Sequence, residues 1–221
     1  MPGPEVTRDL PGAVVLDAFA TGLNTARALA AHGTDVVVVA MGANDVAQYS
    51  RAVSEHRRLA APPSPESLLE LLLNEAPRWR GRVLVAASDL AVETLSRFRG
   101  LLQEDYRVAV PAWPVTRRLL RKDLMRQDAE ACGVATPRSY GELTRAASAR
   151  RDLDYPVVVR PLRSAATAAE ALPKALVVET PRALDAVADR LVAADWRAEV
   201  MELIPGGDER SYHYTALLGR D

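Results

Sequence analysis

Lysine is the scarcest cation in this chain. Only Lys122 and Lys174 are lysines, although Lys and Arg together number 28. Arginine cannot replace lysine where a compact ammonium on a flexible stem is needed, so both positions are candidates for such a site. The alternative is an Ala- and Arg-rich coding bias that happened to leave two lysines. The position of the two lysines among the other motifs decides between these readings.

Cysteine is scarcer still. A single cysteine, Cys132, excludes an internal disulfide and a metal site built from several cysteines. It lies late in an amphipathic helical stretch, which predicts a buried and unreactive thiol.

Long apolar runs and a strong net charge are also missing. The longest apolar run, residues 36–41, is too short to span a bilayer. The start, MPGPEVTRDLPG, has no cationic segment followed by an apolar one, so we expect no secretory signal. A net charge of −1 gives no reason to expect nucleic acid or a membrane as a partner. We expect a soluble, cytoplasmic protein.

Strand and helix patterns alternate through the first half of the chain. Apolar runs predict strands at residues 13–17, 35–40, 82–87 and 107–110, and helical periodicity predicts helices at residues 23–32, 66–74 and 89–102. This alternation predicts an α/β domain over residues 1–114, with a Rossmann-like parallel sheet covered by helices on both faces.

The first strand–turn–helix has little glycine. Its turn contains only Gly22, not the G-x-G-x-x-G fingerprint that lets a backbone approach a pyrophosphate closely. We therefore do not expect a classical NAD site. Two interpretations stay open: the turn binds a small anion at the helix N-terminus, or it only connects the strand to the helix.

The pattern changes after Pro114. Residues 115–132 predict one long or two short helices, and residues 155–161, 175–179, 198–204 and 211–218 predict strands. A helix should start at Pro181, because proline suits the first helical turn. These elements predict a second, small α+β unit over residues 115–221. The last predicted strand would leave an exposed sheet edge, so we expect the chain to be truncated.

Several motifs follow one another in this second half. In chain order they are Lys122-Asp123, Gly133-Val134-Ala135-Thr136-Pro137, Tyr155-Pro-Val-Val-Val-Arg-Pro161, a small-residue loop over residues 162–173, Lys174, and Glu202-Leu-Ile-Pro-Gly-Gly-Asp208. In this order and spacing, the chain resembles the ATP-grasp superfamily over nearly its whole length. Residues 32–41 and 83–102 also resemble the Rossmann-like domain that precedes the ATP-grasp fold in the carboxylate–amine ligase branch.

The resemblance implies an ATP site. It implies that Lys122 and Lys174 contact phosphates, that residues 162–173 form a lid, and that Asp208 binds the ribose hydroxyls. Arg160 stands where a second lysine is usual, and this departure leaves catalytic competence open because a guanidinium cannot place a point charge in the same way. The hinge that holds adenine, mostly through its backbone, would be Met201, Glu202, Leu203 and Ile204.

The resemblance also implies Mg²⁺, with metal ligands on strands that follow the adenine hinge. We expect these ligands beyond Asp221, and we assign no metal ligand and no catalytic residue in this chain.

Two functions follow as hypotheses. The first is the N-terminal part of an ATP-dependent carboxylate–amine ligase, with ATP, a small carboxylate and an amine as partners and an acyl phosphate as intermediate. The second is a degenerate ATP-grasp module that binds nucleotide or a partner without catalysis. A third, weaker hypothesis, a Rossmann-like domain with an unrelated appendage, is disfavoured by the missing glycines. A homodimer stays open, and the identities of the acid and the amine cannot be read from the sequence.

Overall fold

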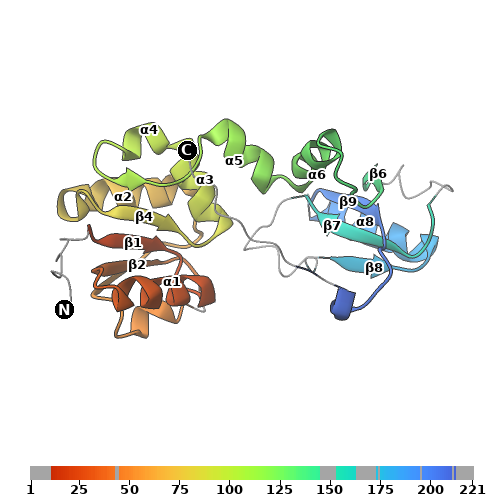
Figure 1. The fold of residues 1–221 in the computed structure, drawn as a ribbon. Helices are drawn as coiled ribbons and strands as arrows, with labels where there is room; N and C mark the ends of the chain where they lie inside the picture. Colours follow the sequence, from red (N-terminus) through yellow and green to blue (C-terminus); the bar gives the residue numbers. More distant parts are fainter. Residues whose placement is uncertain are drawn as a thin grey trace, which may run out of the picture. The chain divides into compact units, whose positions relative to one another are not determined.

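The chain forms two compact units (Figure 1). The computed structural model describes residues 11–42, 45–144, 153–162, 173, 175–194, 196–210 and 212. The first unit ends at Leu120 and the second begins at Arg121.

The first unit is built on a parallel sheet of five strands in the order β3-β2-β1-β4-β5. The strands are β1 (Ala13–Leu16), β2 (Val36–Ala40), β3 (Glu55–Arg58), β4 (Val83–Ala86) and β5 (Arg107–Val108). Every residue of β1 and β2 is buried, as expected for central parallel strands that are covered on both faces.

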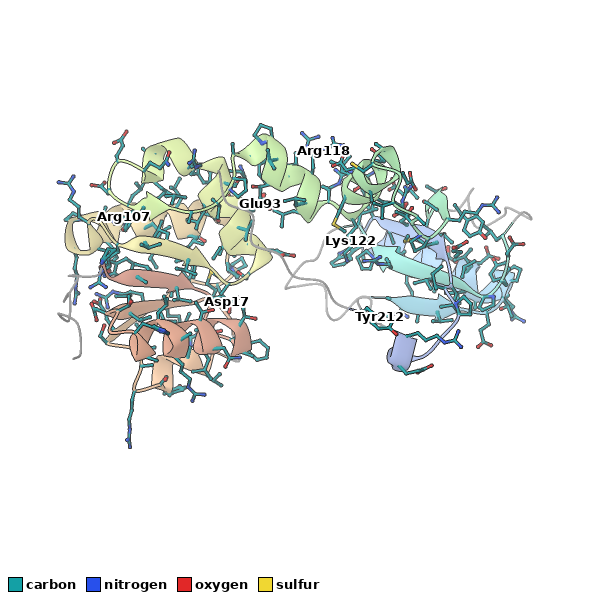
Figure 2. The ribbon with its side chains drawn as sticks, viewed as in Figure 1. Asp17, Glu93, Arg107, Arg118, Lys122 and Tyr212 are labelled. Carbon is teal, nitrogen blue, oxygen red and sulfur yellow. The ribbon has the colours of Figure 1, made fainter. Side chains whose placement is uncertain are left out.

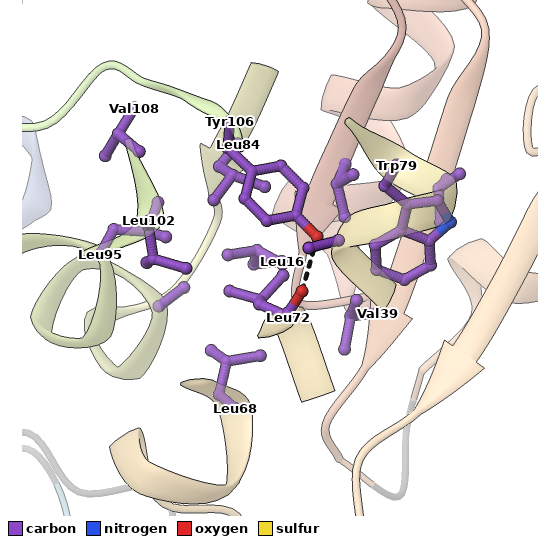
Figure 3. Packing of buried hydrophobic residues seen from close by; sticks show 14 of the residues in the cluster. Leu16, Val39, Leu68, Leu72, Trp79, Leu84, Leu95, Leu102, Tyr106 and Val108 are labelled. Atoms are coloured by element: carbon purple, nitrogen blue, oxygen red, sulfur yellow. Dashed lines mark hydrogen bonds between the residues drawn. The ribbon is translucent and has the colours of Figure 1, made fainter. Parts of the chain in front are cut away.

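Helices cover both faces of this sheet, as predicted. On one face, the apolar side chains of α2 (Pro65–Trp79), α3 (Asp89–Arg97) and α4 (Arg99–Leu102) form one core with β1, β2 and β4 (Figure 3). On the other face, α1 (Ala20–Ala31) and the short 3-10 helix η1 (Ala47–Tyr49) pack on β1 and β2.

Two elements of the first unit differ from the prediction. Strand β3 was not predicted, because its sequence, Glu-His-Arg-Arg, has no apolar residue; it is an edge strand whose side chains are half-buried or exposed. The helix predicted over residues 89–102 is interrupted at Phe98, which closes α3 and precedes α4.

The boundary between the units follows a helix of the first unit. Helix α5 (Trp113–Leu120) is held to α3 because the hydroxyls of Ser96 and Thr116 both donate to the backbone carbonyl of Pro111, at 2.9 and 3.1 Å. The first unit therefore extends to Leu120, whereas the sequence places the division after Pro114.

The second unit contains an antiparallel sheet in the order β6-β9-β7-β8. Its elements are α6 (Lys122–Ala131), β6 (Ser139–Glu142), β7 (Val157–Pro161), β8 (Leu176–Val178), α8 (Pro181–Ala193), β9 (Ala198–Glu202) and the 3-10 helix η2 (Asp208–Arg210). The predicted α+β architecture is confirmed, and β6 was not predicted. The strand predicted over residues 211–218 lies outside the described residues, apart from Tyr212.

One face of this sheet and α8 make the core of the second unit. Val157, Val159 and Val200 point to the same face and pack with Leu184 and Leu191 of α8. The helix that was predicted to start at Pro181 thus packs on this face through its apolar side chains. The opposite face carries more polar side chains.

Two smaller findings concern cysteine and the membrane. Cys132 is exposed, so the predicted buried thiol is wrong: the residue caps the C-terminal end of α6 rather than lying on its packed side. Among the residues that the structure describes, no helix is long and apolar enough to cross a membrane.

Candidate functional site

The second unit contains a pocket of about 300 Å³. Its walls come from α6, from the segment between α6 and β6, and from strands β7 and β9. The lining residues are Lys122, Met125, Arg126, Ala129, Thr136, Pro137, Arg160, Pro161, Glu199 and Met201.

Strand register places three of these side chains on one face of the sheet. Arg160 of β7 lies directly opposite Glu199 of β9, and Val158 lies opposite Met201. Side chains alternate along a strand, so Arg160, Glu199 and Met201 point away from the face that packs on α8. The register therefore brings a cation, a carboxylate and a thioether to the pocket.

Helical spacing brings the remaining wall. Lys122, Met125, Arg126 and Ala129 follow the spacing i, i+3, i+4 and i+7, which is one face of a helix. Lys122 is the first residue of α6 (Figure 2), and its Nζ lies 3.5 Å from the backbone carbonyl oxygen of Pro161 at the end of β7. Two of the three cations predicted for the phosphate site, Lys122 and Arg160, thus line the same pocket.

Arg126 joins α6 to the sheet. Its Nη2 donates to Oε1 of Glu199 at 2.9 Å, and its Nη1 donates to Oε1 of Glu130 at 2.9 Å. The hydroxyl of Ser139 on β6 also donates to Oε1 of Glu199. Burial disfavours the charged guanidinium, but the hydrogen bond with Glu130 and the charge of Glu199 outweigh it and raise the pKa of Arg126.

The carboxylate of Glu130 has a second donor. Oγ1 of Thr136 lies 2.8 Å from Oε1 of Glu130. This hydrogen bond, together with the one from Arg126, lowers the pKa of Glu130, so the group is ionised at neutral pH. The Gly133–Pro137 motif is thereby tied to α6 through Thr136.

The hinge residues lie at and beyond the end of one strand. Met201 lines the pocket, Glu202 is the last residue of β9, and Leu203 and Ile204 follow it with 36% and 56% of their surface exposed. Asp208 begins η2. Lys174 and residues 163–172 of the predicted lid lie outside the described residues.

Four lining residues belong to none of the sequence motifs: Met125, Arg126, Ala129 and Glu199. Two signals in the sequence indicate them. The helical spacing from Lys122 leads to Met125, Arg126 and Ala129, and the alternation along β9 places Glu199 on the same face as Met201.

Packing explains Gly22, the glycine near the turn between β1 and α1. Gly22 lies inside α1, and a Cβ there would come within 1.9 Å of the carbonyl oxygen of Asp17. Asp17 has a positive φ of 100°, and its Oδ1 accepts the backbone N–H of Phe19 at 2.9 Å. Close packing of the helix on this turn accounts for Gly22 without a ligand.

Within the described part of the chain, no group of three or more His, Cys, Asp or Glu residues could hold a metal ion. The carboxylates of the pocket region are instead paired with arginine, as Glu199 and Glu130 are with Arg126.

No family model and no curated protein matches the chain. Solved structures do match. An L-amino acid ligase from Bacillus licheniformis aligns at 14% identity with a TM-score of 0.67, over 90% of this chain and 46% of its own. An N5-carboxyaminoimidazole synthetase from Staphylococcus aureus, solved with ADP, aligns at 14% identity with a TM-score of 0.60, over 88% and 48%. A biotin carboxylase from Campylobacter jejuni aligns at 12% identity with a TM-score of 0.60, over 87% and 45%.

These likenesses define the class of fold. The matched proteins are ATP-grasp enzymes, and the chain spans about half of their length. The chain therefore has the fold of a Rossmann-like domain followed by part of an ATP-grasp domain. The resemblance predicted from the order of the sequence motifs is confirmed at the level of the fold.

Proposed function

We propose that this chain carries part of the ATP site of an ATP-dependent carboxylate–amine ligase. The observation that supports the proposal is the meeting of Lys122 and Arg160 at one pocket, although they are far apart in sequence and come from a helix and a strand. Met201, the first residue of the proposed adenine hinge, lines the same pocket.

The proposed roles follow from the charge of the nucleotide. Lys122, Arg160 and Lys174 would neutralise the phosphates of ATP, because phosphoryl transfer depends mainly on positioning and charge stabilisation. The backbone of residues 201–204, together with the side chains of Met201 and Leu203, would hold adenine. Asp208 would accept hydrogen bonds from the ribose hydroxyls.

The proposed reaction has two steps. A carboxylate oxygen attacks the γ-phosphorus of ATP, ADP leaves, and an acyl phosphate forms. An amine nitrogen then attacks the acyl carbon, phosphate leaves with the electron pair of the broken C–O bond, and the amine loses a proton. Because an acyl phosphate hydrolyses readily, the site must exclude water while this intermediate exists.

Magnesium is part of this chemistry when bound, since it neutralises charge on the transferred phosphoryl group. The described residues offer no cluster of acidic side chains for it. The proposal therefore assigns no residue of this chain to the metal.

Calorimetric titration with ATP tests the nucleotide site. Lys122→Met and Arg160→Met should each weaken ATP binding about tenfold, which is the typical effect of losing one charge-assisted hydrogen bond. The matched control is Arg182→Met, which removes one cation from the exposed side of α8 in the same unit. Absence of ATP binding, or equal losses in all three variants, would contradict the proposal.

The alternative is a nucleotide-binding module without catalysis, and Arg160 favours it because arginine replaces the usual lysine. Release of ADP by the protein of the complete reading frame, with panels of carboxylates and amines, separates the two functions. A ligase releases ADP only when both an acid and an amine are present. The module binds ATP, but its release of ADP does not depend on an acid and an amine. Arg160→Lys does not make it depend on them.

A further inference from the structure

Three large apolar side chains of the first unit form an exposed aromatic patch. They are Phe19, Val46 and Tyr49, and 55%, 47% and 83% of their surfaces are exposed. Phe19 follows β1, whereas Val46 and Tyr49 come from the segment that follows β2. Single exposed apolar residues are ordinary on a protein surface, but a cluster of them indicates an interaction surface.

Backbone contacts hold the two segments of the patch together. The backbone N–H of Ala47 donates to the carbonyl oxygen of Ala18 at 2.8 Å, and both alanines are fully buried. Side chains three residues apart lie on the same side of a 3-10 turn, so Val46 and Tyr49 share one side of η1. Phe19 is the neighbour of Ala18 in the chain. The three side chains therefore stand on an anchored backbone, which limits the entropy lost on binding.

Phe19 is a poor residue for its own position in the helix. It is the N-cap of α1, and its side chain makes no capping hydrogen bond. Serine, threonine, aspartate or asparagine would stabilise this position by about 1 kcal/mol, because their side-chain oxygen accepts an N–H group of the first turn. Neither helix formation nor core packing accounts for a phenylalanine that is 55% exposed here. A contact with another molecule accounts for it, since local preferences are broken mainly at functional positions.

The patch carries no charge. Residues 18–26 and 46–50, which include all three side chains, contain no Asp, Glu, Lys or Arg, although these types make up 26% of the chain. Asp17 and Asp45 precede the two segments, and each accepts a backbone N–H of its own turn. A nucleic acid or a highly charged protein needs opposite charges on the surface that it meets. The patch therefore fits an uncharged, apolar surface.

A second copy of the chain offers such a surface. In a two-fold dimer the same patch faces itself, so a charge within the patch would be repelled by its own copy. Phe19 and Tyr49 together expose about 280 Å², if a fully exposed aromatic side chain has about 200 Å². This is about a third of the roughly 800 Å² that a stable interface buries on each partner. The rings can thus form the apolar centre, with the exposed Arg27 and Arg51, which follow the two segments, at the polar rim.

We propose that Phe19, Val46 and Tyr49 form the centre of a two-fold interface between two copies of this chain. The interface lies wholly in the first unit. It goes beyond the proposed nucleotide site and does not rest on it.

Sedimentation velocity over a wide range of protein concentration tests the interface. We expect the chain to pass from monomer to dimer as its concentration rises, with no larger species, because a two-fold interface closes on itself. Tyr49→Lys places an ammonium group from each copy in the interface and should weaken the dimer about thirtyfold or more. The matched control is Leu101→Lys, because Leu101 is 44% exposed on α4, which covers the other face of the sheet.

Phe19→Ser separates binding from folding. Serine removes the ring and supplies the N-cap oxygen that α1 lacks, so thermal unfolding of the monomer should show equal or greater stability. The dimer should nevertheless weaken about tenfold or more. A less stable monomer would show that the ring serves the fold of its own chain, and would overturn its role in the interface.

The remaining outcomes also decide the matter. A chain that stays monomeric at every concentration, or that forms open-ended larger species, overturns the proposal. A dimer that Tyr49→Lys and Phe19→Ser leave unchanged uses another surface, which overturns it as well. Equal weakening by Leu101→Lys would show that added charge, and not the patch, controls association.

Discussion

The hydroxyl of Tyr106 donates to the backbone carbonyl oxygen of Leu72 at 2.7 Å, inside the core of the first unit (Figure 3). The bond joins the residue that precedes β5 to the middle of α2. Burial of the phenol raises its pKa, and the nearby charges of Asp105 and Glu75 act in the same direction.

This shift predicts a loss of stability at high pH. The folded chain keeps the Tyr106 proton while the unfolded chain releases it above about pH 10, so unfolding becomes easier as the pH rises beyond that value. Tyr106→Phe should make the free energy of unfolding fall less steeply as the pH rises. At neutral pH it should lower that free energy by about 1 kcal/mol, because the hydrogen bond is lost. Urea unfolding at about pH 8 and about pH 11 measures both effects. The two lysines and the five other tyrosines titrate near this range in both proteins, so the comparison of the two slopes removes their contribution. Identical slopes for the two proteins would contradict the prediction.

Leu72 and Leu73 are neighbours on α2 with opposite environments. Leu72 is fully buried, whereas 37% of Leu73 is exposed. Leu72→Ala should lower the free energy of unfolding by about 3 kcal/mol, because it removes buried surface and leaves a cavity. Leu73→Ala should cost about 1 kcal/mol or less. Denaturant unfolding of the two variants gives the comparison, and equal losses would show that α2 does not pack as described.

Lys174 belongs to the proposed phosphate site on the strength of the sequence resemblance alone. Lys174→Ala should weaken ATP binding more than AMP binding, since the proposed contact is with the distal phosphates. Titration of the variant with both nucleotides measures the difference. Equal losses of affinity for ATP and AMP would show that Lys174 does not contact the distal phosphates.

The ion pair between Arg126 and Glu199 should also be visible in stability. Arg126→Leu alone leaves a buried carboxylate whose remaining donor is Ser139, and it should cost about 2 kcal/mol or more. Adding Glu199→Leu should recover most of this loss, because an apolar pair needs no compensating charge. Urea unfolding of the single and double variants measures the coupling between them. Additive losses would mean that the two residues do not interact as described.

Much of the fold could be predicted from local patterns. The runs of valine that became β1 and β2 are buried on both faces, and such runs are typical of central parallel strands. Strand β3 could not be predicted in this way. Its charged residues form a strand because β2 offers a free edge and because Glu55 and Arg57 find ion-pair partners on α2. That information lies outside the segment itself.

The site was predictable where a residue belongs to an ordered series of motifs. Lys122, Arg160 and Met201 are such residues, and they line one pocket. Arg126 and Glu199 belong to no motif, and each is recognised through the other across the packing of α6 on β9. Pairs of this kind depend on tertiary contact, which a single sequence does not reveal.

The two edges of the five-stranded sheet bear on self-association. At one edge, β3 carries Glu55 and Arg57, which pair with each other at 2.7 Å and with the charged side chains of α2. At the other edge, β5 has only two residues. A second copy that added its own strand would meet a strand of paired charged residues at one side and almost no backbone at the other. We therefore expect any homodimer of this chain to form through surfaces other than these sheet edges.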